Sequence, residues 1–493
     1  MFIKIIQLIF LFVCFQQNSF AALKINTWET KEGAKVLFVE NHDLPILDIN
    51  VNFFAGSAQD PTGKEGLAHL TNHLMNLGAG GINEEKLANQ FSDIGAAIGG
   101  DIDLDRAYFK LRTLSSPVQK DKALTLFKYV IHAPDFPIPV LNRERDRIIA
   151  SIKQSMTQPE TIANLAFMKS LYGDHPYAHD EAGNIDTLQK LNQADLKQFY
   201  KNYYLSSEAS IVIVGDVSAD EAKKISESIS QGLPQGNVKH NIASVTDQNY
   251  AGVKKIQHPA KQAHILMGMP ALKRGEKDYF PLYVGNYILG GGGFGTRLMQ
   301  NLREDKAFTY GCYSSLNITE NGSWMSAGGN FKNAVTDSAI TEILKEFAGI
   351  IEANVSDEEL SLTKNNMAGS FARSLERPQT VARFALNTIK QKLAPDYYQN
   401  YLQQLEAITK EDVLRVAQQY FTAKNCHIIV VGNEEILPKL LPFDSDGRIE
   451  KLDAFGAPLK ETKAADLSAD QLIEKYVMAL TATNSKKAAA KKI

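Results

Sequence analysis

The sequence predicts an α+β protein built from two related halves. Residues 195–215 read as a helix followed by an apolar strand that ends in glycine, and residues 412–432 repeat this pattern 217 positions later. Each half also begins with an apolar strand, at residues 46–53 and 263–270, and continues through helical segments. Sheets joined by long helical connections are typical of α/β or α+β layered units. We therefore expect one such unit in each half.

The chain begins with the features of an exported protein. Lys4 precedes an apolar run at residues 5–15, which is followed by a small-residue exit ending at Ala21. This order is typical of a secretory signal peptide cleaved near Ala21, and the run is short for a membrane span. We expect an exported protein, periplasmic or secreted. The predicted parts are a signal peptide (1–21), an N-terminal domain (22–235), a linker (236–252), a C-terminal domain (253–447) and a tail with one helix and a basic end (448–493).

The composition is that of a globular protein without a polyanionic partner. Hydrophobic residues make up 44% of the chain and charged residues 22%, and the net charge of −3 gives no electrostatic basis for binding nucleic acid or an anionic membrane. No stretch after the signal peptide resembles a transmembrane helix. Cys312 and Cys426 lie in strand-like segments. We expect two buried free thiols, although an exported protein could also join them in a disulfide.

Residues 69–73 contain two histidines with metal-binding spacing. His69 and His73 are four residues apart, so on a helix both side chains lie on one face and can hold one metal ion. In the zinc-peptidase signature H-x-x-E-H, the residue before the second histidine is a glutamate that accepts a proton from metal-bound water. Here that residue is Asn72, whose amide cannot accept the proton near neutral pH.

The segment around these histidines resembles a known peptidase family. The run F-A-G-S-A-Q-D-P at residues 54–61 leads through Gly63 and Gly66 into L-A-H at residues 67–69. This closely resembles the N-terminal segment of the pitrilysin/insulinase family of zinc metallopeptidases, in the branch of the mitochondrial processing peptidases. The resemblance covers residues 23–447. It implies that each half is a mainly antiparallel sheet with helices on one face, and that the halves enclose a peptide chamber.

The family's third metal ligand is missing as well. In the family it is a glutamate about 75 residues after the second histidine, in a helix that reads E-R-x-x-I-x-x-E. The matching helix here places Ser151 at the ligand position and keeps Glu144, whose family equivalent supports the ligands without touching the metal. A catalytic zinc ion needs three protein ligands. We therefore expect no tightly held zinc in this chain, and His69 and His73 are the ligands if any metal binds.

The second half keeps residues that could assist a reaction. The glycine run at residues 290–293 is not a phosphate loop, because no Gly-Lys-Ser/Thr follows it, and we expect it to pack against neighbouring backbone. Arg303 and Tyr310 match, in type and spacing, an arginine and a tyrosine that reach across the chamber in the family. The resemblance implies that they hold the substrate and stabilise oxyanion charge. Alternatively, Arg303 caps a helix or pairs with Glu304 or Asp305, and Tyr310 packs in the core.

Two further segments depart from an active peptidase. At the offset of 217, Asn286 and Gly290 take the places of the two histidines, so no metal site is predicted in the second half. Residues 99–105, G-G-D-I-D-L-D, match the edge strand that holds peptides in the family. An edge strand can bind an extended peptide through its main chain. The two glycines weaken this strand, however, and its three aspartates would repel acidic peptides.

Three functions are compatible with these patterns. The first is a non-catalytic subunit of a heteromeric zinc peptidase, in which a homologous partner with an intact H-x-x-E-H motif supplies the zinc. This chain would then contribute peptide binding, Arg303 and Tyr310. The second is a catalytically inert structural or peptide-binding protein of the same fold. The third is a stand-alone metallopeptidase with a rebuilt site, against which Asn72 is the strongest argument.

Overall fold

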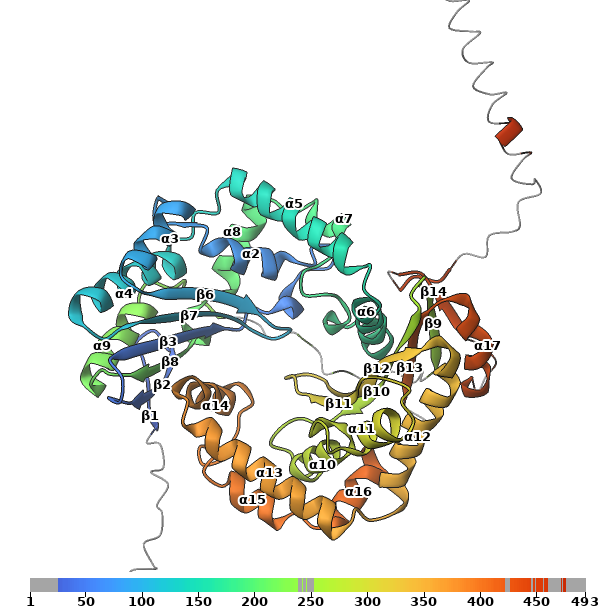
Figure 1. The fold of residues 1–493 in the computed structure, drawn as a ribbon. Coiled ribbons are helices and arrows are strands. Elements are labelled where there is room, and N and C mark those ends of the chain that lie inside the picture. The colour runs from blue at the N-terminus through green and yellow to red at the C-terminus, as the bar shows by residue number, and fades with distance from the viewer. Residues whose placement is uncertain are drawn as a thin grey trace, which may run out of the picture.

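The computed structural model contains two six-stranded sheets that face each other, each with helices on its outer side (Figure 1). It describes residues 25–237, 242, 245, 252–421, 426–444, 447, 449–454, 456–459, 471 and 473–475. The predicted signal peptide, most of the linker and most of the tail, including nearly all of its expected helix, lie outside these residues. Among the residues described, no helix has both the length and the apolar character needed to cross a membrane.

The first sheet is mainly antiparallel and matches the alternating sequence pattern. In its central strand, Leu47, Ile49 and Val51 are buried in the core, because alternate residues of a strand point to opposite faces. Among the described strand pairs of this sheet, only β2 and β8 run parallel. In spatial order the strands are β1 (Ile25–Glu29), β2 (Lys35–Glu40), β8 (Ser210–Gly215), β3 (Ile46–Phe53), β7 (Ala107–Leu114) and β6 (Ala97–Ile102).

The second sheet repeats the first. Strands β11, β12, β10, β13 and β9 follow the same spatial order and directions as β6, β7, β3, β8 and β2. The outermost strand differs, since β1 is antiparallel to its neighbour and β14 is parallel. The fold class expected from the sequence is thus confirmed. In spatial order the strands are β11 (Cys312–Asn317), β12 (Ser323–Lys332), β10 (Gln262–Ala271), β13 (His427–Gly432), β9 (Val253–Gln257) and β14 (Glu450–Leu452).

The offset of the repeat changes by one residue between its two ends. Strands β8 and β13 match at 217, but Ile49 pairs with Ile213 whereas Ile265 pairs with Val430, so β3 and β10 match at 216. The single offset of 217 was therefore wrong for this strand, because a one-residue shift exchanges its two faces. At either offset the counterparts of His69 and His73 are not histidines.

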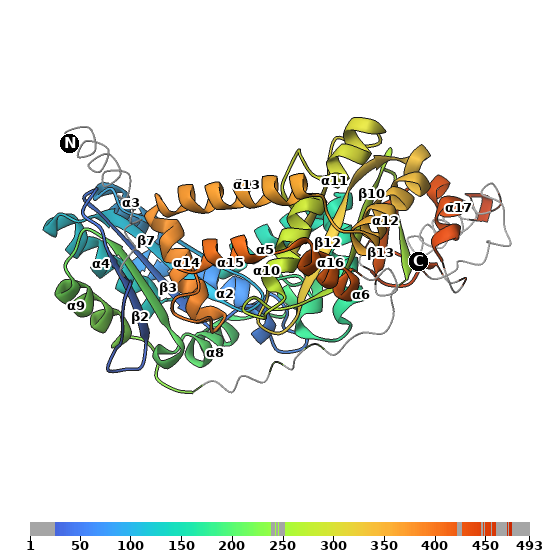
Figure 2. The ribbon, with the colours of Figure 1, turned by 90° about the horizontal axis from the view of Figure 1, so that it is seen from below.

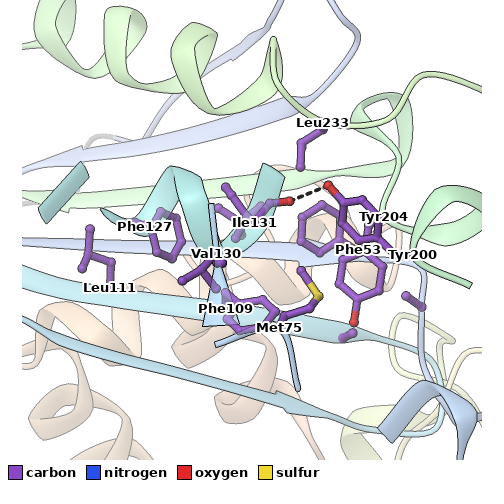
Figure 3. Close-up of a cluster of buried hydrophobic side chains, with 14 of the residues drawn as sticks. Phe53, Met75, Phe109, Leu111, Phe127, Val130, Ile131, Tyr200, Tyr204 and Leu233 are labelled. Atoms are coloured by element: carbon purple, nitrogen blue, oxygen red, sulfur yellow. Dashed lines mark hydrogen bonds between the residues drawn. The ribbon is translucent and has the colours of Figure 1, made fainter. Parts of the chain in front are cut away.

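Helices on the outer side bury the core of the first half. Figure 3 shows Met75 of α2 beside Phe109 of β7, and Phe53 of β3 beside Tyr204, in a cluster that also contains Phe127 of α4. The Tyr200 hydroxyl donates a hydrogen bond of 2.8 Å to the Ile131 carbonyl. The helices are α2 (Leu67–Met75), α3 (Glu84–Asp93), α4 (Pro117–His132), α5 (Ile138–Ser155), α7 (Ile185–Leu188), α8 (Gln193–Tyr203) and α9 (Ala219–Ser230); β4 (Gly78–Ala79) and β5 (Ile82–Asn83) form a small hairpin.

The two repeated helices begin with the same kind of cap. Asn192 and Asp195 form a capping box at the start of α8, and Thr409 and Asp412 form one at the start of α16, so each side chain satisfies a free backbone N–H of the first turn. The helices of the second half are α10 (Tyr279–Asn286), α11 (Arg297–Met299), α12 (Thr336–Glu352), α13 (Asp357–Leu375), α15 (Tyr401–Ala407), α16 (Lys410–Tyr420) and α17 (Leu437–Leu440), with π-helical turns at Tyr287–Gly291 and Gln300–Asp305.

Each half also places one helix on the inner face of the other half's sheet. Helix α14 (Pro378–Lys390), which follows α13, lies against β2 and β8 (Figure 2), where Ala385 and Leu386 pack on Val212 and Val214. Helix α6 (Pro159–Tyr172) lies against β10 and β13. A Cβ atom at Gly268 would lie 2.6 Å from the Phe167 ring, so a glycine allows α6 to approach this sheet. We call α6 and α14 the exchanged helices.

The halves also contact each other through the turns of their edge hairpins, β6–β7 and β11–β12. The turn after β6 and the turn after β11 occupy equivalent places in the repeat and contact each other. The Arg106 Nε donates a hydrogen bond of 2.9 Å to the Glu320 carboxylate, and the Glu320 backbone N–H donates one of 2.9 Å to Asp105. Lys390 of α14 forms an ion pair of 3.2 Å with Asp103. Polar contacts between distant segments therefore hold the two sheets face to face.

Candidate functional site

A tight turn positions the histidine helix α2. Gly66 adopts a φ angle of 93° immediately before the helix, and the Asp60 carboxylate accepts hydrogen bonds of 2.7 Å from the backbone N–H groups of Gly66 and Ala68. A Cβ atom at Gly66 would lie 2.6 Å from the Ala182 carbonyl oxygen, so this position requires glycine. Burial raises the pKa of Asp60 to about 8 although both hydrogen bonds oppose the shift. Asp60, in the run at residues 54–61, thus satisfies backbone N–H groups at the start of the histidine helix.

The two histidines lie on one face of α2, as their spacing predicts. Their rings are stacked, with centroids 6.1 Å apart and an interplanar angle of 12°. Burial is the main cause that lowers the pKa of His69, and a charge on the neighbouring His73 would act in the same direction. Its buried Nδ1 has no hydrogen-bond partner within the described part of the chain. The Nε2 atom of His73 lies 3.0 Å from a carboxylate oxygen of Glu144.

Glu144 contacts His73 from α5. The Glu144 side chain is only 3% exposed, and it accepts hydrogen bonds from the Arg143 Nε at 2.7 Å and from Arg147 at 3.1 Å. Burial would raise the pKa of Glu144, but the bonds from His73, Arg143 and Arg147 outweigh it and lower the pKa to about 2. Ser151, two turns further along α5, is exposed. The carboxylate nearest to the histidines is therefore already neutralised by two arginines.

Asn72 is part of the packing between α2 and the first sheet. It is 2% exposed, and its amide Nδ2 lies 3.3 Å from the Tyr204 hydroxyl and 3.5 Å from the Tyr108 carbonyl oxygen. A Cβ atom at Gly100 of the edge strand β6 would lie 2.9 Å from the Asn72 Oδ1. An amide can donate to a carbonyl oxygen where a carboxylate cannot. The position of the catalytic base has become a structural hydrogen-bond donor.

The residues present do not fit a catalytic zinc ion. Across the described residues, no three or more histidine, cysteine, aspartate or glutamate side chains converge into a metal-holding group. A zinc site would have to take His73 from Glu144 and still lack a proton-accepting carboxylate at Asn72. We assign no catalytic step to a metal held by this chain.

We expect Glu144→Gln to remove an acid-sensitive part of the stability. Because the pKa of Glu144 is depressed, its contribution is fully present above its ordinary pKa near 4.5 and is lost as the pH falls toward 2. Urea unfolding should show a loss of about 2 kcal/mol at pH 7 that shrinks at pH 3. Asp146→Asn, on the exposed side of the same helix, is the control and should change neither value. An equal loss at both pH values would show that the charge of Glu144 does not matter.

In the second half, Tyr310 lines a cavity, and Arg303 lies seven residues before it in the sequence. Tyr310 is 88% exposed, so the alternative that it packs in the core is wrong. Arg303, in the second π-helical turn, forms an ion pair of 3.3 Å with Glu304, as the alternative reading allowed. Its guanidinium carbon also lies 4.8 Å from the centroid of the exposed Phe294 ring. Only the Arg303 Nε takes part in the pair with Glu304.

The cavity beside Tyr310 lies on the inner face of the second sheet. Its volume is about 600 Å³, and hydroxyl, amide and aromatic groups line most of it. The His264 Nδ1 donates a hydrogen bond of 2.9 Å to the Asn330 Oδ1 there, and burial lowers the pKa of His264. The exchanged helix α6 contributes Glu160 and Asn164 to the lining. Such a surface can bind a peptide through its polar main-chain groups.

The glycine run packs against backbone as expected. A Cβ atom at Gly290 would lie 2.5 Å from the Ser314 backbone nitrogen of β11, so the backbone of the first π-helical turn packs closely against this strand. Cys312 and Cys426 are both free and buried, which confirms the thiol prediction, and burial raises the pKa of each to about 12.

The edge strand is present, but only one of the three aspartates expected to repel acidic peptides lies in it. β6 pairs only with β7 in the sheet, and residues 99–101 are exposed, so its outer edge is available to an extended peptide. Of the three aspartates only Asp101 lies in the strand. Asp103 pairs with Lys390, and Asp105 is buried and accepts a hydrogen bond from the Tyr177 hydroxyl. Contacts between the halves, which no local pattern reveals, explain these two residues.

Comparison with known proteins places both halves in one group. A family model described as "Insulinase (Peptidase family M16)" matches residues 35–183, and one described as "Peptidase M16 inactive domain" matches residues 190–367. A "Non-peptidase homolog YmxG" of Helicobacter pylori is 22% identical over 81% of this chain and 92% of its own length.

Solved structures show the same arrangement. A crystal structure of a peptidase M16 inactive domain from Pseudomonas fluorescens is 31% identical, with a TM-score of 0.80, over 83% of this chain and 98% of its own. The periplasmic protease PqqL of Escherichia coli shares the fold at 15% identity, with a TM-score of 0.71, over 84% of this chain and 46% of its own.

Proposed function

Because this chain belongs to the insulinase family of peptidases (peptidase family M16), we propose that it is the non-catalytic subunit of a heteromeric zinc peptidase. Its partner is a homologous subunit with an intact H-x-x-E-H motif, which supplies the zinc ion and the attacking water. This chain contributes peptide binding, and Tyr310 and Arg303 stabilise the carbonyl oxygen of the bond that the partner cleaves.

This proposal rests on a difference between the two halves: the site residues of the first half are engaged in structural contacts, and Tyr310 of the second half is exposed. In the first half, Asn72 is tied to Tyr204 and Glu144 is tied to two arginines, so neither group is available for hydrolysis. In the second half, Tyr310 presents its hydroxyl group at a polar cavity without a role in the core. A phenol in this position can donate a hydrogen bond to a substrate held by another subunit. The name of the Helicobacter pylori relative, a non-peptidase homolog, agrees with a chain that does not hydrolyse peptides by itself.

A catalytically inert structural or peptide-binding protein is the second candidate. The ion pair between the Arg303 Nε and Glu304 favours it, because that pair gives Arg303 a partner within its own chain. The two candidates differ in one result: only the subunit raises the activity of a partner. We also propose that the chain acts after export, most simply in a periplasm, as its signal-like N-terminus and the periplasmic PqqL suggest.

Co-purification with a homologue that carries an intact H-x-x-E-H motif tests the proposal. We expect the isolated chain to contain no stoichiometric zinc and to hydrolyse no peptide, whereas the complex hydrolyses peptides faster than the homologue alone. A chelator should stop hydrolysis by the complex. It should shift the melting temperature of the isolated chain by less than about 1 °C, because only the removal of a bound metal would destabilise the folded state. Stoichiometric zinc in the isolated chain, with hydrolysis abolished by His69→Ala, would instead establish a stand-alone peptidase with a rebuilt site.

A further inference from the structure

A second cavity lies where the two halves meet. It has a volume of about 410 Å³, within the range of roughly 300–1,000 Å³ of small-molecule sites. Its walls are the turns of both edge hairpins, the loop after β10 and the end of the exchanged helix α14. It shares no lining residue with the cavity of Tyr310. The peptidase role proposed above makes no use of it.

The first half contributes a carboxylate without a cation. Glu181, in the loop before α7, lines this cavity, and in the described part of the chain it takes part in no hydrogen bond or ion pair. Burial and the neighbouring carboxylates of Asp103, Asp180 and Asp101 raise the pKa of Glu181 to about 7. A partly buried carboxylate surrounded by others is stabilised by a positively charged group. None of the described side chains supplies one.

The second half contributes a guanidinium without a carboxylate. Arg274, in the loop after β10, stacks over the Tyr279 ring at 4.8 Å and donates one hydrogen bond of 3.1 Å to the Tyr398 hydroxyl. Its Nε is buried and has no acceptor among the described residues, and no described carboxylate pairs with it. A guanidinium has five N–H donors and is suited to bind a carboxylate with two parallel hydrogen bonds.

The other charged groups of the cavity already have partners. Arg106 is bound to Glu320, and Lys390 is bound to Asp103. Asp105 accepts hydrogen bonds from the Tyr177 hydroxyl and the Glu320 backbone N–H. The Oε1 of Gln391, at the end of α14, is a further buried acceptor for which the described residues provide no donor. The cavity therefore offers unused acceptors of a positive group and unused donors to a negative group at the same time.

We propose that this cavity binds a small zwitterion, a free amino acid or a short peptide with free termini, whose ammonium group contacts Glu181 and whose carboxylate binds Arg274. A simple anion would leave Glu181 uncompensated and would meet the surrounding acids, and a simple cation would leave Arg274 unpaired. Because Glu181 belongs to the first half and Arg274 to the second, the bound ligand bridges the two halves.

Calorimetric titration of the isolated full chain with three peptides tests this site without a partner subunit. Trialanine should bind at pH 8, where Glu181 is ionised, and N-acetyl-trialanine and trialanine amide should each bind at least tenfold more weakly, since each lacks one charge. In Glu181→Gln, N-acetylation should no longer weaken binding. In Arg274→Met, amidation should no longer weaken it.

Two controls separate recognition from folding. Glu358→Gln and Arg383→Met, on the exposed sides of α13 and α14, should bind trialanine like the natural chain. Arg274→Lys keeps the positive charge and should retain part of the affinity. If Arg274→Met acted only through its lost contact with Tyr279, it would weaken the binding of all three peptides equally. Absence of trialanine binding up to about 10 mM, or equal binding of free and capped peptides, would refute the site. Neither result bears on whether the chain activates a partner.

Discussion

Tyr310→Phe is expected to lower the kcat of the two-subunit complex by about 100-fold, the usual effect of removing one oxyanion donor. The hydroxyl is exposed at the cavity and supports no core packing, so the melting temperature should not change. KM should change little if the hydrogen bond strengthens only in the transition state. Arg303→Ala should act in the same direction, and Arg303→Lys should recover only part of the activity, because a lysine lacks the planar fork.

A matched control is available in the same cavity. Tyr313 also lines it and is 48% exposed, but it has no counterpart in the arginine and tyrosine pair. We expect Tyr313→Phe to change kcat by less than about threefold, the effect of a lost peripheral contact. If Tyr310→Phe and Tyr313→Phe had the same kcat as the natural complex, Tyr310 would have no role in the reaction. Steady-state kinetics with a fixed excess of this chain over its partner gives the comparison.

Ala385→Asp is expected to destabilise the chain by about 4 kcal/mol, because it buries a carboxylate without a partner. Ala385 is fully buried between α14 and the inner face of the first sheet. Arg383→Asp places the same carboxylate on the exposed side of the same helix and should cost much less. Urea unfolding measures the difference between the two variants.

The same pair of variants tests what holds the halves together. If α14 is needed for the face-to-face arrangement, small-angle scattering of Ala385→Asp under native conditions should give a larger radius of gyration than that of Arg383→Asp. Equal unfolding free energies for the two variants would mean that the contact between α14 and the sheet contributes little.

Much of the fold is predictable because its signals are local. Alternating apolar residues identify β3, the polar caps at Asn192 and Thr409 mark the starts of α8 and α16, and the repeat carries both from one half to the other. The exchanged helices are different. The apolar face of α14 indicates that it is buried but not against which sheet, since an amphipathic pattern does not name its partner. The one-residue change of offset is likewise visible only in the strand pairing.

The candidate site divides in the same way. Asn72 and Ser151 could be recognised from the sequence, because the resemblance to the peptidase family assigns a role to each of these positions. Glu144 could also be identified, because it begins the E-R-x-x-I sequence of the matching helix. Its contacts with Arg143 and Arg147 lie within that one helix. Glu181 and Arg274 gave no signal, because they are single charged residues in loops 93 positions apart, and only the meeting of the halves makes them neighbours of one cavity.

The exchanged helices give this single chain the construction of an intertwined homodimer. In a domain-swapped dimer, each subunit completes its neighbour with an identical element. Here α6 and α14 are those elements, and the covalent connection between the halves replaces subunit association with an intramolecular encounter at high effective concentration. The separated halves should therefore be poorly folded alone and should regain structure when mixed. The two sheets should also unfold in one cooperative transition, since neither has a complete inner face of its own.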